Sequence, residues 1–189
     1  NEIATEIAAT LAFSAMQNND KIGLILFSET IELFIPPKKG KSHVLRIIRE
    51  LLEFEPKSKK TNISEALKFL SSVMKKKAIV FVLSDFIADE YEQTLKIASK
   101  RHDVTGIQIY DEKETTIPNL GIVQMEDEET GAIKLINTTS KSVRKNYASY
   151  YHEKKKYFQE TFDQKTCCVS FCEYCYFFKI NSSIFEVLH

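Results

Sequence analysis

Apolar and polar residues follow one another along this chain in patterns that predict alternating strands and helices. Residues 21–28 and 78–83 are nearly continuous apolar runs, which are typical of strands buried on both faces of a parallel sheet. Residues 1–17, 42–52 and 63–74 instead repeat their apolar positions every three or four residues, as amphipathic helices do. The alternation predicts an α/β fold in which helices cover a mostly parallel sheet.

Turn and cap residues predict where several of these elements end. Residues 31–35 are expected to pair antiparallel with the preceding strand and to stop at Pro36-Pro37, because proline cannot donate a hydrogen bond to a ladder. Ser42 and Asn62 are the expected N-caps of the two helices that follow them. The first half of the chain is therefore expected to consist of strands and capped helices joined by short turns.

The second half continues this pattern and ends in a segment of different composition. Its predicted elements are a helix over residues 89–100, a strand over 103–110, a hairpin over 121–126 and 132–137, and a helix over 140–162. Residues 164–189 form a tail rich in cysteine and aromatic residues, in which 169–171 or 176–180 is the expected strand and 183–188 the expected helix. We expect this tail either to complete the sheet or to be aberrant, as after a frame error.

All four cysteines lie in this tail, at positions 167, 168, 172 and 175. A secreted disulfide framework would spread its cysteines over the fold, so we expect the cysteine-free body to be cytoplasmic. Cys172 and Cys175 have the spacing of half a zinc site. No histidine or second spaced pair completes that site in the sequence, and buried or incidental cysteines are the favoured interpretation.

Charge and length narrow the class of partner. The 189 residues include 26 basic and 26 acidic side chains, so the net charge is zero, and the overall charge attracts neither nucleic acid nor an anionic membrane. No apolar run reaches the roughly 20 residues of a membrane span, and the first residues do not have the pattern of a signal peptide. The chain begins without an initiator methionine, which we interpret as the start of a fragment or a processed product.

Asp85 is the first candidate for chemistry, because it follows the apolar run of residues 78–83 within Ser84-Asp85-Phe86. Functional side chains of open α/β sheets lie just beyond the carboxyl ends of the strands. The structural alternative is that Asp85 only caps a turn or the next helix. No glycine-rich phosphate loop is present in the sequence, so a nucleotide site of that type is not expected.

Two other groups of residues carry weaker signals. His102-Asp103 is like the metal-binding pair of phosphohydrolases, but the other histidines are isolated in the sequence. A helix end leading into a strand is the favoured interpretation, because histidine is favourable at a helix C-terminus. A basic cluster consists of Lys38, Lys39, Lys41, Arg46 and Arg49. This cluster is either a solvated face or a surface that docks an acidic partner.

An ordered set of segments resembles a known family. The segments are residues 20–28, 34–40, 43–52, 60–61, 84–86 and 101–104. In this order they resemble the von Willebrand factor A-like domain of a bacterial family of uncharacterised proteins that is associated with MoxR-type AAA+ ATPases. We assign residues 1–163 to a partial domain of this type and residues 164–189 to the tail.

The resemblance implies a Rossmann-like, three-layer sandwich with a metal site at the carboxyl edge of its sheet. Such domains bind Mg²⁺ or Mn²⁺ through an Asp-x-Ser-x-Ser loop after the first, central strand, a threonine of a second loop, and an aspartate after the fourth strand. Thr61 matches the second position and Asp85 the third. The hard cation leaves one coordination position for an acidic side chain of a partner.

The chain departs from this family pattern at its start. It contains no Asp-x-Ser-x-Ser sequence, and the central strand is expected to be missing. Thr61 and Asp85 are therefore expected to be the remainder of an incomplete or vestigial metal site, and this chain alone is expected to bind no metal. Either the parent protein continues upstream, or the remaining strands pair directly with one another.

The resemblance implies a non-enzymatic adaptor or scaffold that works with a MoxR-type AAA+ ATPase in assembling or remodelling another protein complex. No nucleophile–base pair or paired carboxylates are visible in the sequence, which favours this function over catalysis. One alternative is a metal-dependent phosphoester hydrolase that uses Asp85 and His102. The other is an inactive truncated product, which would unfold without cooperativity.

Overall fold

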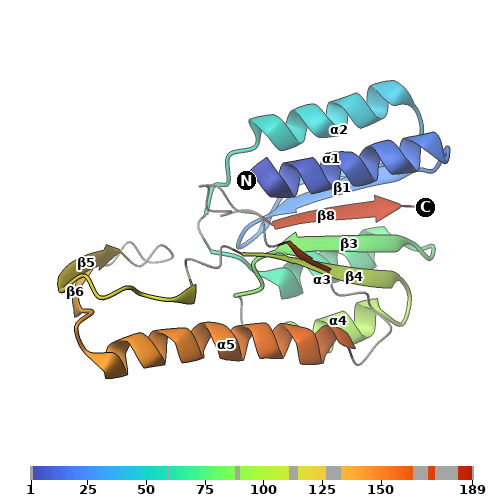
Figure 1. Cartoon of the computed structure of the whole chain (residues 1–189). Coiled ribbons are helices and arrows are strands. Elements are labelled where there is room, and N and C mark those ends of the chain that lie inside the picture. The colour runs from blue at the N-terminus through green and yellow to red at the C-terminus, as the bar shows by residue number, and fades with distance from the viewer. Residues whose placement is uncertain are drawn as a thin grey trace.

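The computed structural model describes residues 2–58, 60–87, 90–110, 115–126, 133–163, 170–172 and 183–188. Its helices are α1 (Glu2–Gln17), α2 (Lys41–Glu53), α3 (Ile63–Val73), α4 (Glu92–Ala98) and α5 (Lys141–Asp163). Its strands are β1 (Ile22–Phe27), β2 (Ile31–Lys38), β3 (Ile79–Ser84), β4 (Asp103–Ile109), β5 (Ile122–Glu126), β6 (Ile133–Asn137), β7 (Ser170–Cys172) and β8 (Ser183–Leu188). The mixed α/β fold expected from the sequence is observed (Figure 1).

The main sheet has the strand order β2-β1-β8-β3-β4-β7. Strands β1, β3, β4 and β7 run in one direction, whereas β2 and β8 run in the other. The sheet is therefore mixed and not mostly parallel as expected: among the described ladders β3–β4 and β4–β7 are parallel, whereas β1–β2, β1–β8 and β3–β8 are antiparallel. The carboxyl ends of β1, β3 and β4 share one edge, here called the carboxyl edge. Their amino ends share the opposite one, the amino edge.

Strand β8 occupies the centre of this sheet. It pairs antiparallel with β1 on one side and with β3 on the other. The alternative in which the remaining strands pair directly with one another is therefore not observed for β1 and β3, and the tail supplies a strand of the sheet, as one of its two interpretations anticipated. Residues 183–188 form this strand and not the expected helix, because Ile, Phe and Val favour extended structure and six residues are too few for a stable isolated helix. The strand expected at 169–171 is observed as Ser170–Cys172. The alternative at 176–180 lies outside the described residues.

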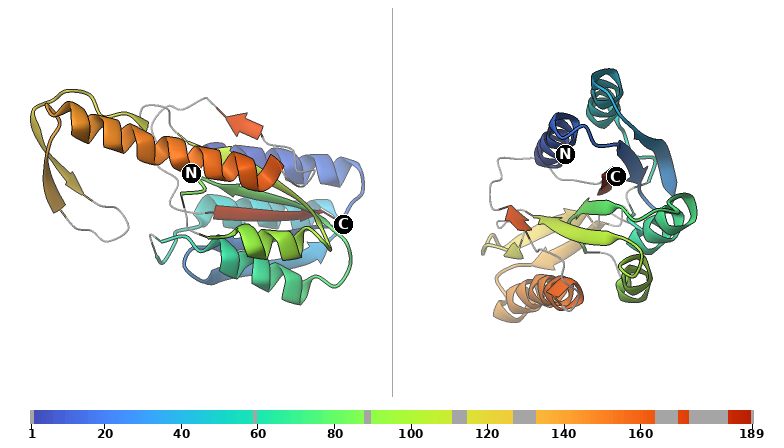
Figure 2. Two further views of the ribbon diagram at one scale, coloured as in Figure 1. Left: turned by 90° about the horizontal axis from the view of Figure 1, so that it is seen from below. Right: turned by 90° about the vertical axis from the view of Figure 1, so that its right-hand side faces the viewer.

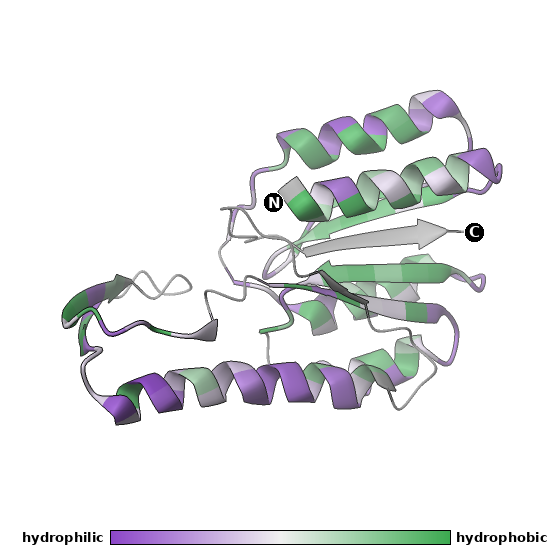
Figure 3. Ribbon diagram, in the orientation of Figure 1, coloured by the Kyte–Doolittle hydropathy of each residue, from purple (hydrophilic) through white to green (hydrophobic). Residues whose placement is uncertain are grey.

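Two apolar cores lie on the two faces of the sheet. Helices α1 and α2 cover one face, and α3, α4 and α5 cover the other (Figure 2). Because successive strand residues point to opposite faces, β1 supplies Leu24 and Leu26 to the first core and Ile25 and Phe27 to the second. All four side chains are fully buried, and each burial stabilises the fold by about 1.5–3 kcal/mol. The hydropathy colouring shows the same contrast between apolar strands and the mostly polar α5 (Figure 3).

Three predicted element ends differ from the structure. Strand β2 continues through Pro36 and Pro37, which is tolerated because β2 is an outer strand of the sheet, with a neighbour on one side only in the described strand order. The N-cap of α2 is Gly40, and no side chain caps this helix, so Ser42 is not its N-cap. Helix α4 begins at Glu92, later than predicted; the predicted first residue lies outside the described part of the chain.

Hairpin β5–β6 projects away from the main sheet, beside the first turns of α5 (Figures 1 and 2). Thr138 anchors its base, because its Oγ1 accepts a hydrogen bond from Leu120 N–H at 2.9 Å and donates to the Gly121 carbonyl at 2.7 Å. The C-terminal half of α5 packs on the sheet through Phe158 and Phe162. Helix α5 therefore connects the projecting hairpin to the core.

Candidate functional site

The carboxyl edge gathers polar residues that end or follow the buried strands. Ser28 follows β1, Ser84 ends β3, and Gln108 lies near the end of β4; all three are buried. Asp85 follows Ser84 and is half-buried. Buried polar groups need hydrogen-bond partners, and here most of those partners belong to the loops of the same edge.

The loop before α3 brings Thr61 to this edge. The backbone N–H of Asn62 donates to the Ser28 carbonyl at 2.8 Å, and the Asn62 side chain caps α3 as predicted. Ser64 Oγ donates to the carbonyl of Glu90 at 3.0 Å, in the loop that follows β3. These bonds hold the half-buried Thr61 at the same edge as the aspartate, so the structure brings the two predicted site residues to one edge.

Asp85 lies in a tight turn. Its Oδ1 accepts a hydrogen bond from Ile87 N–H at 3.2 Å, and its carbonyl accepts one from Gln108 Nε2 at 3.0 Å. Phe86 has a φ of 55°, in the left-handed region that non-glycine residues seldom adopt, and its N–H donates to Ser84 Oγ at 3.2 Å. The turn interpretation of Asp85 is therefore confirmed, and it leaves room for a further role at the edge.

A cluster of aromatic side chains in the core holds this turn in place through Phe86. Phe86 is fully buried, and its ring centroid lies 4.4 Å from that of Phe158, 5.3 Å from that of Phe162 and 5.7 Å from that of Tyr91. Phe158 and Phe162 belong to α5, so this helix holds the backbone next to Asp85 in place. Sequence reasoning missed this contribution of Phe86, although a large aromatic residue directly after a strand-end aspartate was a usable signal.

Gln108 is a second residue that sequence reasoning missed. Its side chain is buried, and within the described part of the chain its Oε1 has no hydrogen-bond partner. Such an acceptor is costly to bury, which makes Gln108 a candidate for contact with a ligand or partner at this edge. The available signal was a polar residue flanked by the apolar Ile107 and Ile109.

The resemblance implies Mg²⁺ or Mn²⁺ at this edge, and the described residues fit such a site only in part. A cation of this kind takes about six oxygen ligands. Thr61 offers a hydroxyl and Asp85 a carboxylate, one oxygen of which already accepts a backbone hydrogen bond. Among the residues described, no group of three His, Cys, Asp or Glu side chains could hold a metal ion. Thr61 and Asp85 therefore offer two oxygen-bearing side chains at this edge, fewer than such a cation takes.

His102 lies at the opposite edge of the sheet from Asp85. Strands β3 and β4 are parallel and in register; His102 precedes β4, whereas Asp85 follows β3. With a rise of about 3.3 Å per residue, the strands separate the two side chains by roughly 20 Å. The hydrolase hypothesis that pairs Asp85 with His102 is therefore wrong. The backbone N–H of His102 donates to the Ala98 carbonyl at 2.9 Å, so His102 lies in the turn that follows the end of α4 and leads into β4, in agreement with the structural interpretation.

The environment of His102 disfavours its charged form. The side chain is buried, and neither ring nitrogen has a hydrogen-bond partner within the part of the chain that the structure describes. Burial lowers the pKa of His102 below its usual 6.5, and the neighbouring Arg101 lowers this pKa further, while Asp103 opposes them. His102 is therefore a neutral buried histidine near neutral pH.

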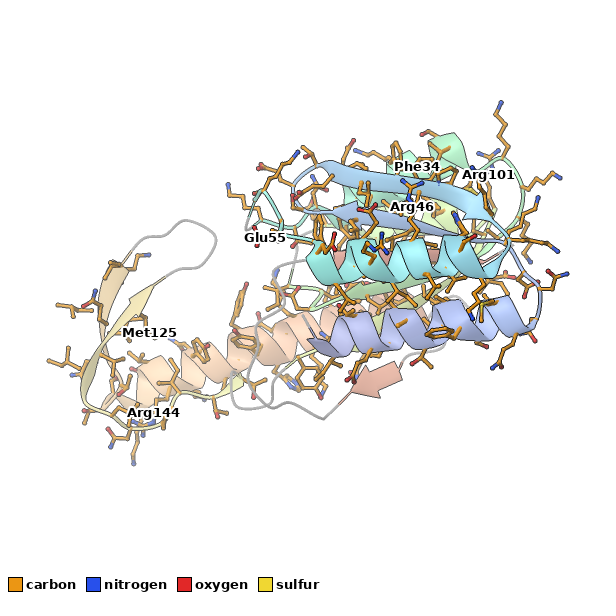
Figure 4. The ribbon with its side chains drawn as sticks, turned by 90° about the horizontal axis from the view of Figure 1, so that it is seen from above. Phe34, Arg46, Glu55, Arg101, Met125 and Arg144 are labelled. Atoms are coloured by element: carbon orange, nitrogen blue, oxygen red, sulfur yellow. The ribbon has the colours of Figure 1, made fainter. Side chains whose placement is uncertain are left out.

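The basic cluster of the sequence divides into two groups. Arg46 and Arg49 lie along the exposed face of α2, and Arg46 Nε is 3.7 Å from Glu50 Oε1. Figure 4 shows Arg46 on this helix, with Arg101 near one end of the sheet and Glu55 near the other. The lysines of the cluster lie at the amino edge, so the cluster does not form one continuous patch along α2.

Comparison with known proteins gives a family and uncharacterised relatives. A family model described as "Protein of unknown function DUF58" matches residues 1–157. Uncharacterized proteins of Mycobacterium tuberculosis and Mycobacterium bovis are each 20% identical to this chain over 136 residues, which is 70% of this chain and 43% of the relative. The chain thus spans less than half the length of these curated relatives.

A solved structure is similar to this fold. The crystal structure of the conserved hypothetical protein BatB from Bacteroides thetaiotaomicron matches with a TM-score of 0.55 and 15% sequence identity, over 92% of this chain and 80% of that chain. At this level of identity the likeness shows the fold alone. In the described part of the chain, no helix is both long and apolar enough to cross a membrane.

Proposed function

Because this chain belongs to the family described as "Protein of unknown function DUF58", we propose that it is a non-enzymatic adaptor or scaffold built on a von Willebrand factor A-like three-layer sandwich. It works in the cytoplasm with a MoxR-type AAA+ ATPase in the assembly or remodelling of a protein complex. The ordered segments that carry the resemblance support this proposal. The observation that carries it is the carboxyl edge, where hydrogen bonds join Asn62, next to Thr61, to Ser28 after β1, and Ser64 of α3 to Glu90 in the loop that follows β3 and Asp85.

A carboxyl edge of this kind suits protein binding. The turn at Asp85 is fixed before any partner arrives, by the Gln108 hydrogen bond and by the packing of Phe86. A surface that is ordered in advance loses less conformational entropy on association. The half-buried hydroxyl of Thr61 and carboxylate of Asp85 then provide polar contacts that select a partner by geometry.

The family resemblance adds a divalent cation to this mechanism. Mg²⁺ or Mn²⁺ held by hydroxyl and carboxylate oxygens leaves a position for an acidic side chain of the partner. Thr61 and Asp85 would hold such an ion together with ligands that the described residues do not supply. We therefore propose that this chain alone binds Mg²⁺ weakly or not at all, and that its edge is completed by further ligands.

Co-purification tests the adaptor function. The tagged, unsubstituted protein is purified from cell lysates in buffers with and without Mg²⁺. AAA+ ATPases that remain bound to it are identified by mass spectrometry. Asp85→Asn keeps the size of the side chain and an acceptor for Ile87 N–H but removes the charge, and Thr61→Val removes the hydroxyl. Glu55→Gln is the matched control, because Glu55 is an exposed carboxylate in a loop of the same edge.

We expect retention of a MoxR-type ATPase by the parent protein and by Glu55→Gln, and a clear loss for Asp85→Asn and Thr61→Val. If no AAA+ ATPase is retained with or without Mg²⁺, the adaptor proposal is wrong. An equal loss for Glu55→Gln would show that net charge, and not the position of Asp85, controls the contact.

A further inference from the structure

Four connections of the chain meet at the amino edge of the sheet. Pairing in register joins Lys38 to Ile22, Ile22 to Leu188, Leu188 to Ile79, and Ile79 to Asp103. These residues form one row across the sheet. The connections that begin or end at this row therefore lie at one height, at the opposite end of the strands from the Thr61 and Asp85 edge.

Every one of these connections carries exposed positive charge. The cations are Lys21, Lys38, Lys39, Lys41, Lys75, Lys76, Lys77, Lys100 and Arg101, and all nine are exposed. The same connections contain two carboxylates, Asp20 and Asp103, and the Asp103 carboxylate lies 3.0 Å from Lys77 Nζ. A chain with no net charge thus concentrates a strong positive excess at one edge, which we call the lysine edge.

We propose that the lysine edge binds an anionic membrane surface. Eight of its nine cations are lysines, which act as compact, strongly hydrated point charges, whereas arginine is the residue suited to bidentate recognition of phosphate. Lysine is depleted in specific protein–protein interfaces, where aromatic anchors are enriched, and aromatic platforms are typical of single-stranded nucleic-acid sites. Residues 18–21, 38–41, 74–78 and 99–103 contain no Phe, Tyr or Trp.

The shape of the lysine edge fits a planar partner. The row that aligns it crosses five neighbouring strands, which at about 4.8 Å per interval spans roughly 19 Å. Clustered lysines at one height are drawn to the negative potential of an anionic leaflet, which falls off within a Debye length of about 10 Å. The carboxyl edge lies roughly 20 Å away, so its carboxylates do not cancel this attraction. Docked in this way, the chain presents Thr61 and Asp85 to the aqueous phase.

Vesicle co-sedimentation of the full chain tests this inference. The probes are vesicles of phosphatidylcholine alone and vesicles of an equal mixture of phosphatidylcholine and phosphatidylglycerol, at low and at high salt. In the test variant, Gln replaces three exposed lysines from two connections of the lysine edge, Lys39, Lys75 and Lys76. The matched control replaces Lys134, Lys141 and Lys145 by Gln, which are equally exposed but lie on β6 and α5.

We expect binding to the anionic vesicles alone, lost at high salt. Each lysine near an anionic surface changes partitioning by about fivefold, so the test variant should bind roughly a hundredfold more weakly while the control is nearly unchanged. Circular dichroism verifies that both variants keep the fold. No binding to anionic vesicles, or an equal loss in the control, overturns the proposal. Binding of a DNA duplex or of polyglutamate, but not of vesicles, also overturns it and identifies the other class of partner. Because the proposed adaptor role is tested on Asp85 and Thr61, either proposal can fail without the other.

Discussion

Substitution of Gly106 by Ala tests how closely α5 packs on the sheet. A Cβ atom at Gly106 would lie 2.6 and 2.7 Å from two ring carbons of Phe162 and 2.9 Å from a ring carbon of Phe158. Carbon atoms in good contact are about 3.5–4.0 Å apart, so both rings would have to retreat by about 1 Å. Such a shift is costly, because Phe158 and Phe162 are buried and pack against each other at a tilt, with ring centroids 4.8 Å apart.

The cost of this substitution is the balance of two terms. Overpacking of a core costs about 1–3 kcal/mol, whereas replacing glycine in an unstrained position stabilises by about 0.4–1 kcal/mol through the unfolded chain. We therefore expect Gly106→Ala to lower the free energy of unfolding by about 1–2 kcal/mol. Denaturant unfolding followed by circular dichroism measures this change, provided that the transition is cooperative and its slope is unchanged.

A double-mutant cycle identifies the cause of that loss. Phe162→Leu shortens the side chain that the new methyl group would meet, so the double variant should be more stable than the sum of the two single losses by about 0.5–1.5 kcal/mol. A neutral or stabilising Gly106→Ala, or strict additivity with Phe162→Leu, would refute the close contact. Helix α5 would then not be the element that fixes Phe86 beside Asp85.

Three other predictions address single features of the fold. Tyr91→Phe should raise the free energy of unfolding by about 1 kcal/mol in denaturant titrations, because the Tyr91 hydroxyl is buried without a partner in the described structure. Burial also raises the pKa of Tyr91, so the hydroxyl stays protonated. A loss of stability would show that the hydroxyl has a partner. Burial lowers the pKa of His102 in the folded chain below 6.5, so near this pH the unfolded chain binds more protons than the folded one, and stability should fall as the pH drops below 6.5. Denaturant unfolding at about pH 5.5 and 7.5 should show this loss of stability. His102→Leu should make the difference between the two pH values smaller. Deletion of residues 183–189 removes β8, which pairs with both β1 and β3. We expect the full chain to unfold cooperatively and the deletion variant to unfold without a cooperative transition. If the full chain itself shows no cooperative transition, the inactive-fragment hypothesis is favoured.

The buried strands and their helices could be predicted from local patterns. The apolar runs at β1 and β3 and the side-chain cap of α3 by Asn62 are properties of a few consecutive residues, and the structure confirms them. The prolines of β2 led to a wrong prediction of where this strand ends, because the rule against proline applies to central strands and not to an outer strand of a sheet. Whether a strand is an outer one depends on which strands pair. The placement of β8 was unpredictable for the same reason, since its partners are more than 90 residues away in the sequence.

The candidate site shows the same division. Asp85 could be singled out because it directly follows a buried strand, and Thr61 because of the family resemblance. The Phe86 contacts with α5 and the bond between Gln108 and Asp85 join residues far apart in the chain. No local pattern encodes such contacts. The same limit applies to the lysine edge, whose charges are scattered in the sequence and meet only through the register of the strands.

The two edges of the sheet differ in how strongly their side chains are held, and this difference bears on their roles. At the carboxyl edge, the Asp85 turn is fixed by backbone hydrogen bonds and by a left-handed Phe86 that the aromatic cluster keeps in place. Strain of this kind persists only where surrounding structure enforces it, so this edge can select a partner by geometry. At the amino edge, Lys77 is paired with Asp103, but the other lysines are exposed and form no ion pair among the described residues, and a lysine that is not immobilised loses little entropy when it approaches a charged surface. The rigid edge is therefore suited to a specific contact and the lysine edge to a nonspecific one. A single sheet, with its strands spanning both edges, would then orient the specific contact relative to the charged surface.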